Sequence, residues 1–243
     1  MQTSNLQDGN VGNLGDVLKH AALVQLAKFF AENIATEKYY LDSHSYLYQS
    51  RLAADDWQKI VQGLLEDSSL YQNYIDIEAP FIETGNYLCS SGLVNKLIPD
   101  AHLLLCETNR ETREWLLQQL ADNKVSYHTV KAQMEKWVKG KKFKKLPNLL
   151  ALIDPFEMTD ELWLSVNKCL RSMLVESSPV ILLVFDYKEV RSRDWPETSD
   201  NWLSSVACIS RQPYHLAVYA SPEFVEPVGS ILKELGWKIS PLD

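Results

Sequence analysis

Leu149-Leu150-Ala151-Leu152-Ile153-Asp154 and Val180-Ile181-Leu182-Leu183-Val184-Phe185-Asp186 are two apolar runs in the second half of a 243-residue chain, and they indicate the class of fold. Each run has the length of a strand and lacks polar alternation, which is typical of central strands that helices cover on both faces. A helical pattern near residues 159–176 lies between them. Strands that alternate with helices predict a parallel sheet, and therefore an α/β fold.

The same alternation extends towards both ends of the chain. It predicts helices over residues 16–33, 110–122 and 227–235, and further strands over residues 38–42, 102–107, 127–132, 206–210 and 215–220. Residues 53–77 interrupt the pattern, because Trp57, Val61 and Leu64 recur there at helical spacing. We therefore predict one domain, residues 1–243, with a seven-stranded, mostly parallel sheet and a small helical insertion over residues 49–86.

Composition narrows the class of protein. The content of 46% hydrophobic and 23% charged residues suits a single buried core. No apolar run reaches the roughly 18 to 20 residues of a membrane span, and residues 1–15 lack the features of a signal peptide, so we expect a cytoplasmic protein. The four cysteines are far apart and indicate buried thiols rather than a metal site. A net charge of −8 disfavours indiscriminate nucleic-acid binding.

Polar side chains stand where several predicted strands end. Asp42, Glu107, Gln133 and Asp154 each lie at or just beyond the carboxyl end of a strand. Open α/β sheets bind ligands at this edge, so we expect the four side chains to converge on one crevice.

One tract carries more polar residues than folding requires: Val11-Gly12-Asn13-Leu14-Gly15-Asp16-Val17-Leu18-Lys19-His20. A helix that begins near Asp16 needs an N-cap and apolar residues at spacings of three and four, which Val17, Leu23 and Val24 already supply. The adjacent cation and imidazole of Lys19 and His20 therefore indicate a functional site.

This tract closely resembles Ala-Gly-Asn-His-Ala-Asp-Val-Leu-Lys-His, found near the N-terminus of the RlmJ family of 23S ribosomal RNA adenine-N6 methyltransferases. Further matches follow in the same order: Leu41-Asp42-Ser43-His44 resembles the family's Leu-Asp-Thr-His, Tyr87-Leu88-Cys89-Ser90-Ser91 its Tyr-Pro-Gly-Ser-Pro, and Asp154-Pro155-Phe156-Glu157-Met158 its Asp-Pro-Pro-Tyr-Glu-Met. The resemblance implies a Rossmann-like class I methyltransferase fold, S-adenosylmethionine as the cofactor, and ribosomal RNA as the partner.

The resemblance also implies roles for individual residues. The residues that would line the cofactor site are His20, His44, Ser90, Glu107, Gln133 and Asp154. The chain departs from the family at three places: Gln133 replaces an aspartate, Ser45-Tyr46-Leu47-Tyr48 replaces Ala-Gly-Ala-Gly, and the turn after Asp154 lacks one proline. Glycines let the backbone approach a ligand and adopt positive φ, so the tyrosines of the second departure are an obstacle to cofactor binding.

Asp154 is the candidate catalytic residue. The exocyclic amine of adenine is a poor nucleophile because its lone pair is delocalised into the ring. By resemblance, Asp154 would accept a hydrogen bond from the amine, the carbonyl of Pro155 would accept a second, and Phe156 would stack on an extruded base. The structural alternative is a strand-ending aspartate before a proline turn, with Phe156 packed in the core.

Three other candidates also have structural explanations. Glu107 lies just before the predicted helix 110–122, where an acidic side chain favours the helix dipole. Ser90 is a common residue type for turns and helix caps. His20 is equally consistent with a packed helix histidine.

Residues 136–145, Lys-Trp-Val-Lys-Gly-Lys-Lys-Phe-Lys-Lys, form a local basic run in an acidic chain. Lys141, Lys142 and Lys144, together with Lys19, are candidates for binding RNA phosphates. A solvated basic loop is the alternative.

The leading interpretation is a cytoplasmic, S-adenosylmethionine-dependent adenine-N6 methyltransferase of ribosomal RNA, which needs no metal. A second interpretation is a catalytically inactive methyltransferase-like module that binds RNA or protein, since binding sites can be lost without loss of the fold. A third is the same chemistry on another adenine-containing substrate, such as DNA. The oligomeric state is not predicted.

Overall fold

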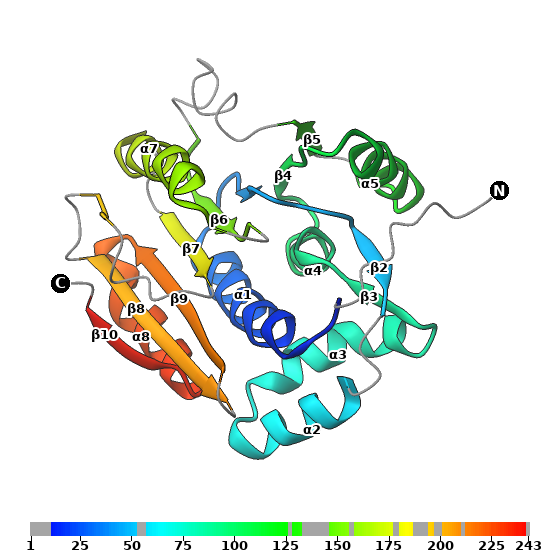
Figure 1. Ribbon diagram of the computed structural model, residues 1–243, viewed down its shortest axis with the longest axis horizontal. Coiled ribbons are helices and arrows are strands. Elements are labelled where there is room, and N and C mark those ends of the chain that lie inside the picture. Colours follow the sequence, from blue (N-terminus) through cyan, green and yellow to red (C-terminus); the bar gives the residue numbers. More distant parts are fainter. Residues whose placement is uncertain are drawn as a thin grey trace.

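The computed structural model describes residues 11–52, 57–125, 128–132, 146–155, 158–176, 180–186, 194–196, 201–209 and 212–241. Its main sheet contains β1 (Tyr39–Asp42), β4 (His102–Cys106), β5 (His128–Lys131), β6 (Leu149–Ile153), β7 (Val180–Asp186), β8 (Trp202–Ile209), β9 (Gln212–Ala220) and β10 (Lys238–Pro241). The order across this sheet is β10-β8-β9-β7-β6-β1-β4-β5 (Figure 1).

The sheet is mostly parallel, as predicted. β5, β4, β1, β6 and β7 pair in parallel, while β9 runs antiparallel to both β7 and β8. All seven predicted strands are present, but β10 adds an eighth, antiparallel to β8 at the edge of the sheet. The sequence Lys238-Ile239-Ser240-Pro241 is short and carries a proline. Edge strands tolerate such residues and give a weak signal in the sequence.

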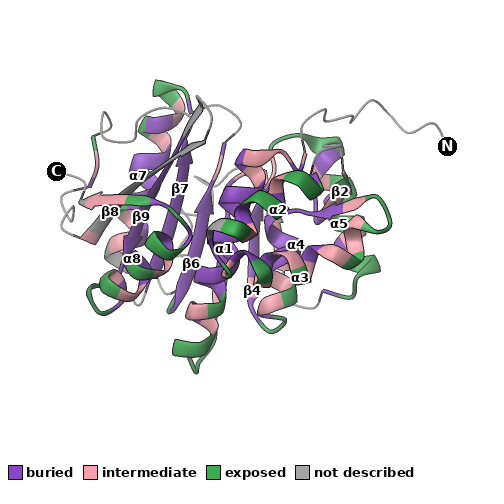
Figure 2. Ribbon diagram, turned by 90° about the horizontal axis from the view of Figure 1, so that it is seen from below, coloured by how far each residue is buried: buried purple, intermediate pink, exposed green. Residues whose placement is uncertain are grey.

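Helices cover the two faces of the sheet. One face carries α1 (Leu14–Asn33), α4 (Ser90–Leu97), α5 (Arg110–Asp122) and α8 (Val225–Glu234), and the other carries α7 (Asp160–Glu176). Within β6, Leu150 and Leu152 belong to the first apolar core, whereas Leu149, Ala151 and Ile153 belong to the second. Figure 2 shows β6 and β7 in the colour of buried residues. This two-sided burial explains why both strands are apolar throughout.

α1 is buried along most of its length. Its first turn is capped by Asn13, whose side chain accepts a hydrogen bond from the backbone N–H of Asp16, and residues 17–27 are all buried. A helix that is buried on all sides holds polar side chains only where they have partners. Lys19 and His20 are such residues, so their contacts bear on the function of the site.

A small unit is inserted between β1 and α4. It consists of β2 (Gln49–Arg51), α2 (Trp57–Asp67), α3 (Tyr71–Ile82) and β3 (Asn86–Leu88), with β2 and β3 paired antiparallel. α2 and α3 lie side by side and contact α1, as Figure 1 shows. We propose that the helical insertion of residues 49–86 corresponds to these elements.

Three cysteines, Cys89, Cys106 and Cys169, are buried free thiols. Among the residues that the structure describes, no helix is long and apolar enough to cross a membrane, and no group of three or more His, Cys, Asp or Glu side chains is arranged to hold a metal ion.

Candidate functional site

The topology of the sheet locates the site. The parallel strands follow one another along the chain as β1, β4, β5, β6 and β7. Across the sheet they lie in the order β5-β4-β1-β6-β7. The direction of winding therefore reverses between β1 and β6, and doubly wound sheets bind ligands beyond the carboxyl ends of the strands at such a point. Asp42 ends β1, and Asp154 follows directly after β6. Both carboxylates thus flank the switch point.

Lys19 joins α1 to this edge of the sheet. Its Nζ donates a hydrogen bond to Asp154 Oδ2 and another to Asp16 Oδ1, 3.0 Å away. Asp16 Oδ2 in turn accepts the backbone N–H of Gly12 at 3.0 Å. Burial lowers the pKa of Lys19, but the carboxylates of Asp154 and Asp16 outweigh it and raise that pKa above its usual value. Lys19 is therefore a fixed cation.

The carboxylate of Asp154 remains partly accessible, with 19% of its side-chain surface exposed. Burial raises its pKa, and this effect outweighs the lowering by the Lys19 ammonium group. Pro155, the next residue, is buried. The arrangement presents an acceptor oxygen at the end of β6 beside a permanent positive charge.

Asp42 is completely buried and fully engaged. Its Oδ2 accepts hydrogen bonds from Ser90 Oγ and, at 3.3 Å, from the hydroxyl of Tyr40, while Oδ1 accepts the backbone N–H of His44 at 3.2 Å. Burial raises the pKa of Asp42 to about 6, against the opposing effect of the bonds from Ser90 and His44. Ser90 opens α4, so the positive end of that helix dipole lies near this carboxylate.

The segment after β1 follows an unusual path. Tyr46 has φ = 47°, a left-handed conformation that is rare for any residue except glycine. The backbone N–H of Ser45 donates to the carbonyl of Cys106 at 2.8 Å, and the Ser45 hydroxyl, which is buried, has no hydrogen-bond partner within the described part of the chain. Tyr48 turns into the core, where its hydroxyl donates to Asn95 of α4 at 3.1 Å. Of the two tyrosines, Tyr48 therefore points away from the strand ends.

Glu107 follows β4 and is hydrogen-bonded to the segment after β1. Its carboxylate accepts the backbone N–H of Asn109 at 2.7 Å and is also hydrogen-bonded by the backbone of Tyr46 and Thr108. Burial raises the pKa of Glu107, and these bonds only partly offset the rise. The side chain lies just before α5, so both its capping role and a ligand-facing role are compatible with its position.

Both candidate histidines are held neutral. Burial and the charge of Lys19 lower the pKa of His20 to about 3, and burial lowers that of His44 to about 4. His20 Nδ1 lies 2.8 Å from the hydroxyl of Tyr87, and His44 Nδ1 lies 2.7 Å from Ser43 Oγ. Neither imidazole adds a positive charge at neutral pH.

The structure brings several predicted residues together. Lys19 donates a hydrogen bond to Asp154, and the hydroxyl of Ser90 and the backbone N–H of His44 both donate to Asp42. Sequence reasoning assigned no site role to Asp16 or Tyr87. The spacing of Asp16, Lys19 and His20 at i, i+3 and i+4 places them on one side of α1 and could have indicated Asp16. Gln133, Phe156, Lys141, Lys142 and Lys144 lie outside the described residues.

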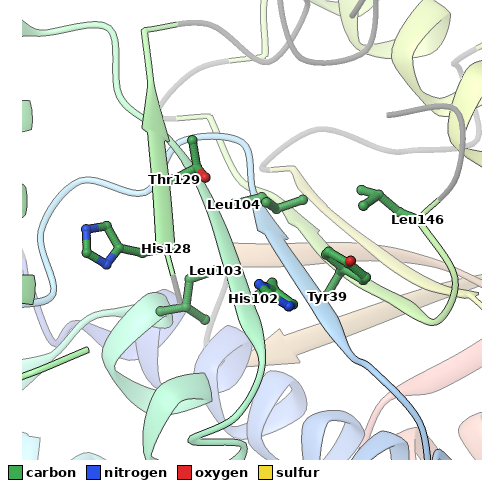
Figure 3. Close-up of a pocket in the computed structure, with 7 residues that line it drawn as sticks. All are labelled: Tyr39, His102, Leu103, Leu104, His128, Thr129 and Leu146. Carbon is green, nitrogen blue, oxygen red and sulfur yellow. The ribbon is translucent and has the colours of Figure 1, made fainter. Parts of the chain in front are cut away.

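A separate cavity of about 290 Å³ opens at the other end of the strands (Figure 3). Tyr39, His102 and His128, the first residues of β1, β4 and β5, line it together with Leu103, Leu104, Thr129 and Leu146. The rings of Tyr39 and His102 stack there with centroids 4.9 Å apart. Because this cavity lies at the amino ends of the strands, it does not belong to the candidate site.

Comparisons with known proteins show a similarity of fold but no match in sequence. No protein-family model and no curated protein sequence matches the chain. Protein LPL1258 from Legionella pneumophila, described under the family DUF519, has a similar structure, with a TM-score of 0.65, 16% identity, and coverage of 95% of this chain and 98% of that one. At this identity the likeness concerns the fold alone.

Weaker structural likenesses include two methyltransferase structures. The N-terminal domain of human METTL16 in complex with SAH has a TM-score of 0.48 and 10% identity, and covers 84% of this chain and 70% of that one. An rRNA methylase from Streptococcus thermophilus has a TM-score of 0.45 and 9% identity, and covers 81% of this chain and 94% of that one. At these TM-scores neither likeness bears on the activity of this chain.

Proposed function

We propose that this protein is an S-adenosylmethionine-dependent methyltransferase that acts on the N6 amine of adenine in ribosomal RNA. The observation that carries the proposal is the position of Asp154-Pro155: it directly follows β6 at the switch point, with the Asp154 carboxylate held by Lys19. The motifs that resemble the RlmJ family supply the remaining support, because they occur in the same order along the chain.

The groups at this edge suit a nucleoside ligand. Glu107 and Asp154 place carboxylates just beyond the ends of β4 and β6, on either side of β1 in the sheet, and carboxylates accept hydrogen bonds from hydroxyl and amine groups. The buried Ser45 hydroxyl, which has no hydrogen-bond partner among the described residues, adds a polar group in the segment after β1. We assign His20, His44, Ser90, Glu107 and Gln133 to the cofactor. The cofactor supplies an electrophilic methyl group on a sulfonium ion.

Asp154 would orient the amine. An oxygen of its carboxylate would accept a hydrogen bond from the adenine amine, which would direct the nitrogen lone pair out of the ring and towards the methyl group of the cofactor. Lys19 keeps that carboxylate in place, since its ammonium group is bound to both Asp154 and Asp16. The carbonyl of Pro155 and the ring of Phe156 would hold the base.

A second candidate function is the inactive module, and one observation favours it. Tyr46, which stands where the family has a glycine, keeps a left-handed backbone and donates its N–H to Glu107. The carboxylate that would bind ribose hydroxyls is thus already engaged by the segment that would need to approach the cofactor. The same chemistry on DNA is a further alternative that the site geometry does not address.

The first experiment is calorimetric titration of the purified, folded protein with S-adenosylmethionine and, separately, with S-adenosylhomocysteine. Micromolar binding would support the cofactor site, and absence of binding at millimolar ligand would favour the inactive module. Methyl transfer to unmodified ribosomal RNA is then compared for the wild type and Asp154→Ala. We expect the substitution to abolish transfer, and Asp122→Asn, which alters an exposed carboxylate on α5, to leave it unchanged.

RNA binding is tested separately. Charge reversal at Lys141, Lys142 and Lys144 should weaken RNA binding and reduce its dependence on salt, by close to one unit of log–log slope for each phosphate that is no longer bound. Unchanged binding would make residues 136–145 a solvated loop without a role in RNA recognition.

A further inference from the structure

Four buried side chains from four different elements form one continuous hydrogen-bonded series. Trp57 of α2 lies with Nε1 3.5 Å from the hydroxyl of Tyr74 on α3, that hydroxyl lies 2.9 Å from the hydroxyl of Tyr87 on β3, and the Tyr87 hydroxyl lies 2.8 Å from His20 Nδ1 on α1. Tyr74 and Tyr87 are completely buried, and Trp57 and His20 are 5% exposed. The series runs from the inserted helices to the side of α1 that carries Asp16, Lys19 and His20.

The indole of Trp57 determines the direction of the series. An indole N–H is only a donor, so the Tyr74 oxygen accepts from Trp57. The Tyr74 hydroxyl proton is then directed to Tyr87, and the Tyr87 proton to His20 Nδ1. In the opposite direction the buried Tyr74 hydroxyl proton would have no acceptor among the described residues, because the indole N–H beside it can only donate.

This direction specifies the chemical form of His20. Because Nδ1 accepts a hydrogen bond, the ring proton resides on Nε2 and the imidazole is neutral. A charged imidazole would set its own N–H against the Tyr87 hydroxyl proton. The lowered pKa of His20 agrees with this form.

The Nε2–H group is free to bind a ligand. Within the described part of the chain, the only hydrogen bond of the His20 side chain is the one between Nδ1 and Tyr87, and Nε2 is not among the buried polar atoms without a partner. His20 also directly follows Lys19, which is bound to Asp154. His20 therefore follows, on α1, the residue whose side chain reaches the end of β6 at the switch point.

We infer that Tyr87, Tyr74 and Trp57 are positioning residues, which hold His20 as a neutral Nε2–H donor for a hydrogen-bond acceptor of a ligand at the switch point. The identity of that ligand rests on the proposed function, but the form of His20 does not. The inserted helices therefore act on the site through His20.

The test is ¹⁵N NMR of protein labelled at histidine, with the His20 signals assigned by His20→Gln. In the wild type we expect Nε2 to carry the proton and Nδ1 to be unprotonated throughout pH 5 to 8. Tyr87→Phe removes the donor to Nδ1, so this single form should give way to a mixture of tautomers. Tyr71→Phe is the matched control: it removes a buried hydroxyl from α3 that donates to the carbonyl of Leu235, outside the series, and should leave the His20 signals unchanged.

Ligand binding gives a second readout. Tyr87→Phe should weaken S-adenosylhomocysteine binding by about five- to tenfold, the usual effect of one misplaced hydrogen bond, and Tyr71→Phe should not. Thermal unfolding verifies that both variants fold. A wild-type His20 that is charged or protonated at Nδ1 at pH 7, or a Tyr87→Phe variant with wild-type signals and wild-type affinity, would overturn the inference.

The same data separate the two proposals. If His20 has the expected form and responds to Tyr87→Phe, while the wild type binds no S-adenosylhomocysteine, the positioning series stands and the proposed cofactor is wrong. If the wild type binds S-adenosylhomocysteine but His20 lacks the expected form, the proposed cofactor is supported and the positioning series is wrong.

Discussion

Lys19 illustrates how one buried cation organises a site. It lies on α1, between Asp16 of the same helix and Asp154, which directly follows β6, and only 9% of its side chain is exposed. Burying a single charge is costly unless it is paired. The Asp16-Lys19-Asp154 cluster thus satisfies the cation and at the same time orients the candidate catalytic carboxylate.

Lys19→Met should destabilise the protein by roughly 3 kcal/mol, because it leaves two partly buried carboxylates near each other without a cation. Denaturant unfolding monitored by circular dichroism measures the change. Lys28→Met, an exposed lysine on the same helix, is the control and should change stability by less than about 0.5 kcal/mol. Adding Asp154→Asn to Lys19→Met should restore part of the loss, and no recovery would argue against this ion pair.

Glu78 is a buried ionisable group and predicts a pH dependence of stability. Burial raises the pKa of Glu78 to about 8, although its Oε2 accepts the backbone N–H of Leu88 at 3.0 Å. In the unfolded state the pKa of this carboxyl group is about 4.3. Between these values the folded state binds more protons than the unfolded state, so stability falls as the pH rises through this window.

We expect the free energy of unfolding to fall by roughly 2 kcal/mol between pH 6.5 and 8.5 through this group. The lowered pKa values of His20 and His44 have the opposite effect, but only below about pH 6.5. Glu78→Gln should therefore flatten the pH profile in this window, whereas Glu66→Gln, at an exposed position on α2, should retain it. Identical slopes in the two variants would show that Glu78 is ionised in the folded protein at neutral pH.

Among the elements, α4 shows how closely the segment after β1 must pack. A Cβ atom at Gly92 would lie 2.8 Å from Leu88 Cδ2 and would also collide with the carbonyl oxygen of Tyr48. The absence of a side chain at Gly92 thus lets the backbone at Tyr48 lie directly against the helix that begins with Ser90. This close packing helps to bring Ser90 to Asp42.

Gly92→Ala should destabilise the protein by about 1–3 kcal/mol, the usual cost of overpacking a core. Part of the clash involves backbone, which cannot rotate away as a side chain can. Gly63→Ala, on α2 with open space around it, is the matched control and should stabilise the helix by about 0.5–1 kcal/mol. Thermal unfolding compares the two, and equal stabilities would refute the close approach of α4 to Tyr48.

For the whole molecule, ligand binding should appear as added stability. A ligand that binds only the folded state adds about 2.7 kcal/mol at a concentration of 100 Kd. For a domain of this size, S-adenosylhomocysteine should then raise the Tm by roughly 5–10 °C. Adenine alone at the same concentration is the control and should have a smaller effect, and an unchanged Tm at millimolar S-adenosylhomocysteine would contradict the proposed cofactor.

Much of the architecture could be predicted from the sequence because it depends on local periodicity. The apolar runs of β6 and β7 and the helical spacing of residues 159–176 specify elements whose burial is the same along their whole length. β10 could not be predicted in this way, because it is a short edge strand. Its partner, β8, lies far away along the sequence. Candidate residues such as Lys19 and Asp154 were found through motif order, which carries no information about their mutual distance.

The α/β class, the parallel strands and the placement of Asp42, Glu107 and Asp154 at strand ends follow from the sequence, since each depends on a pattern within a few residues. The contact of Lys19 with Asp154, the turn of Tyr48 towards α4, and the series from Trp57 through Tyr74 and Tyr87 to His20 depend instead on the packing of the folded chain. These interactions join residues that are far apart along the chain. They depend on the packing of α1 between the sheet and the inserted helices, and no local pattern encodes that packing.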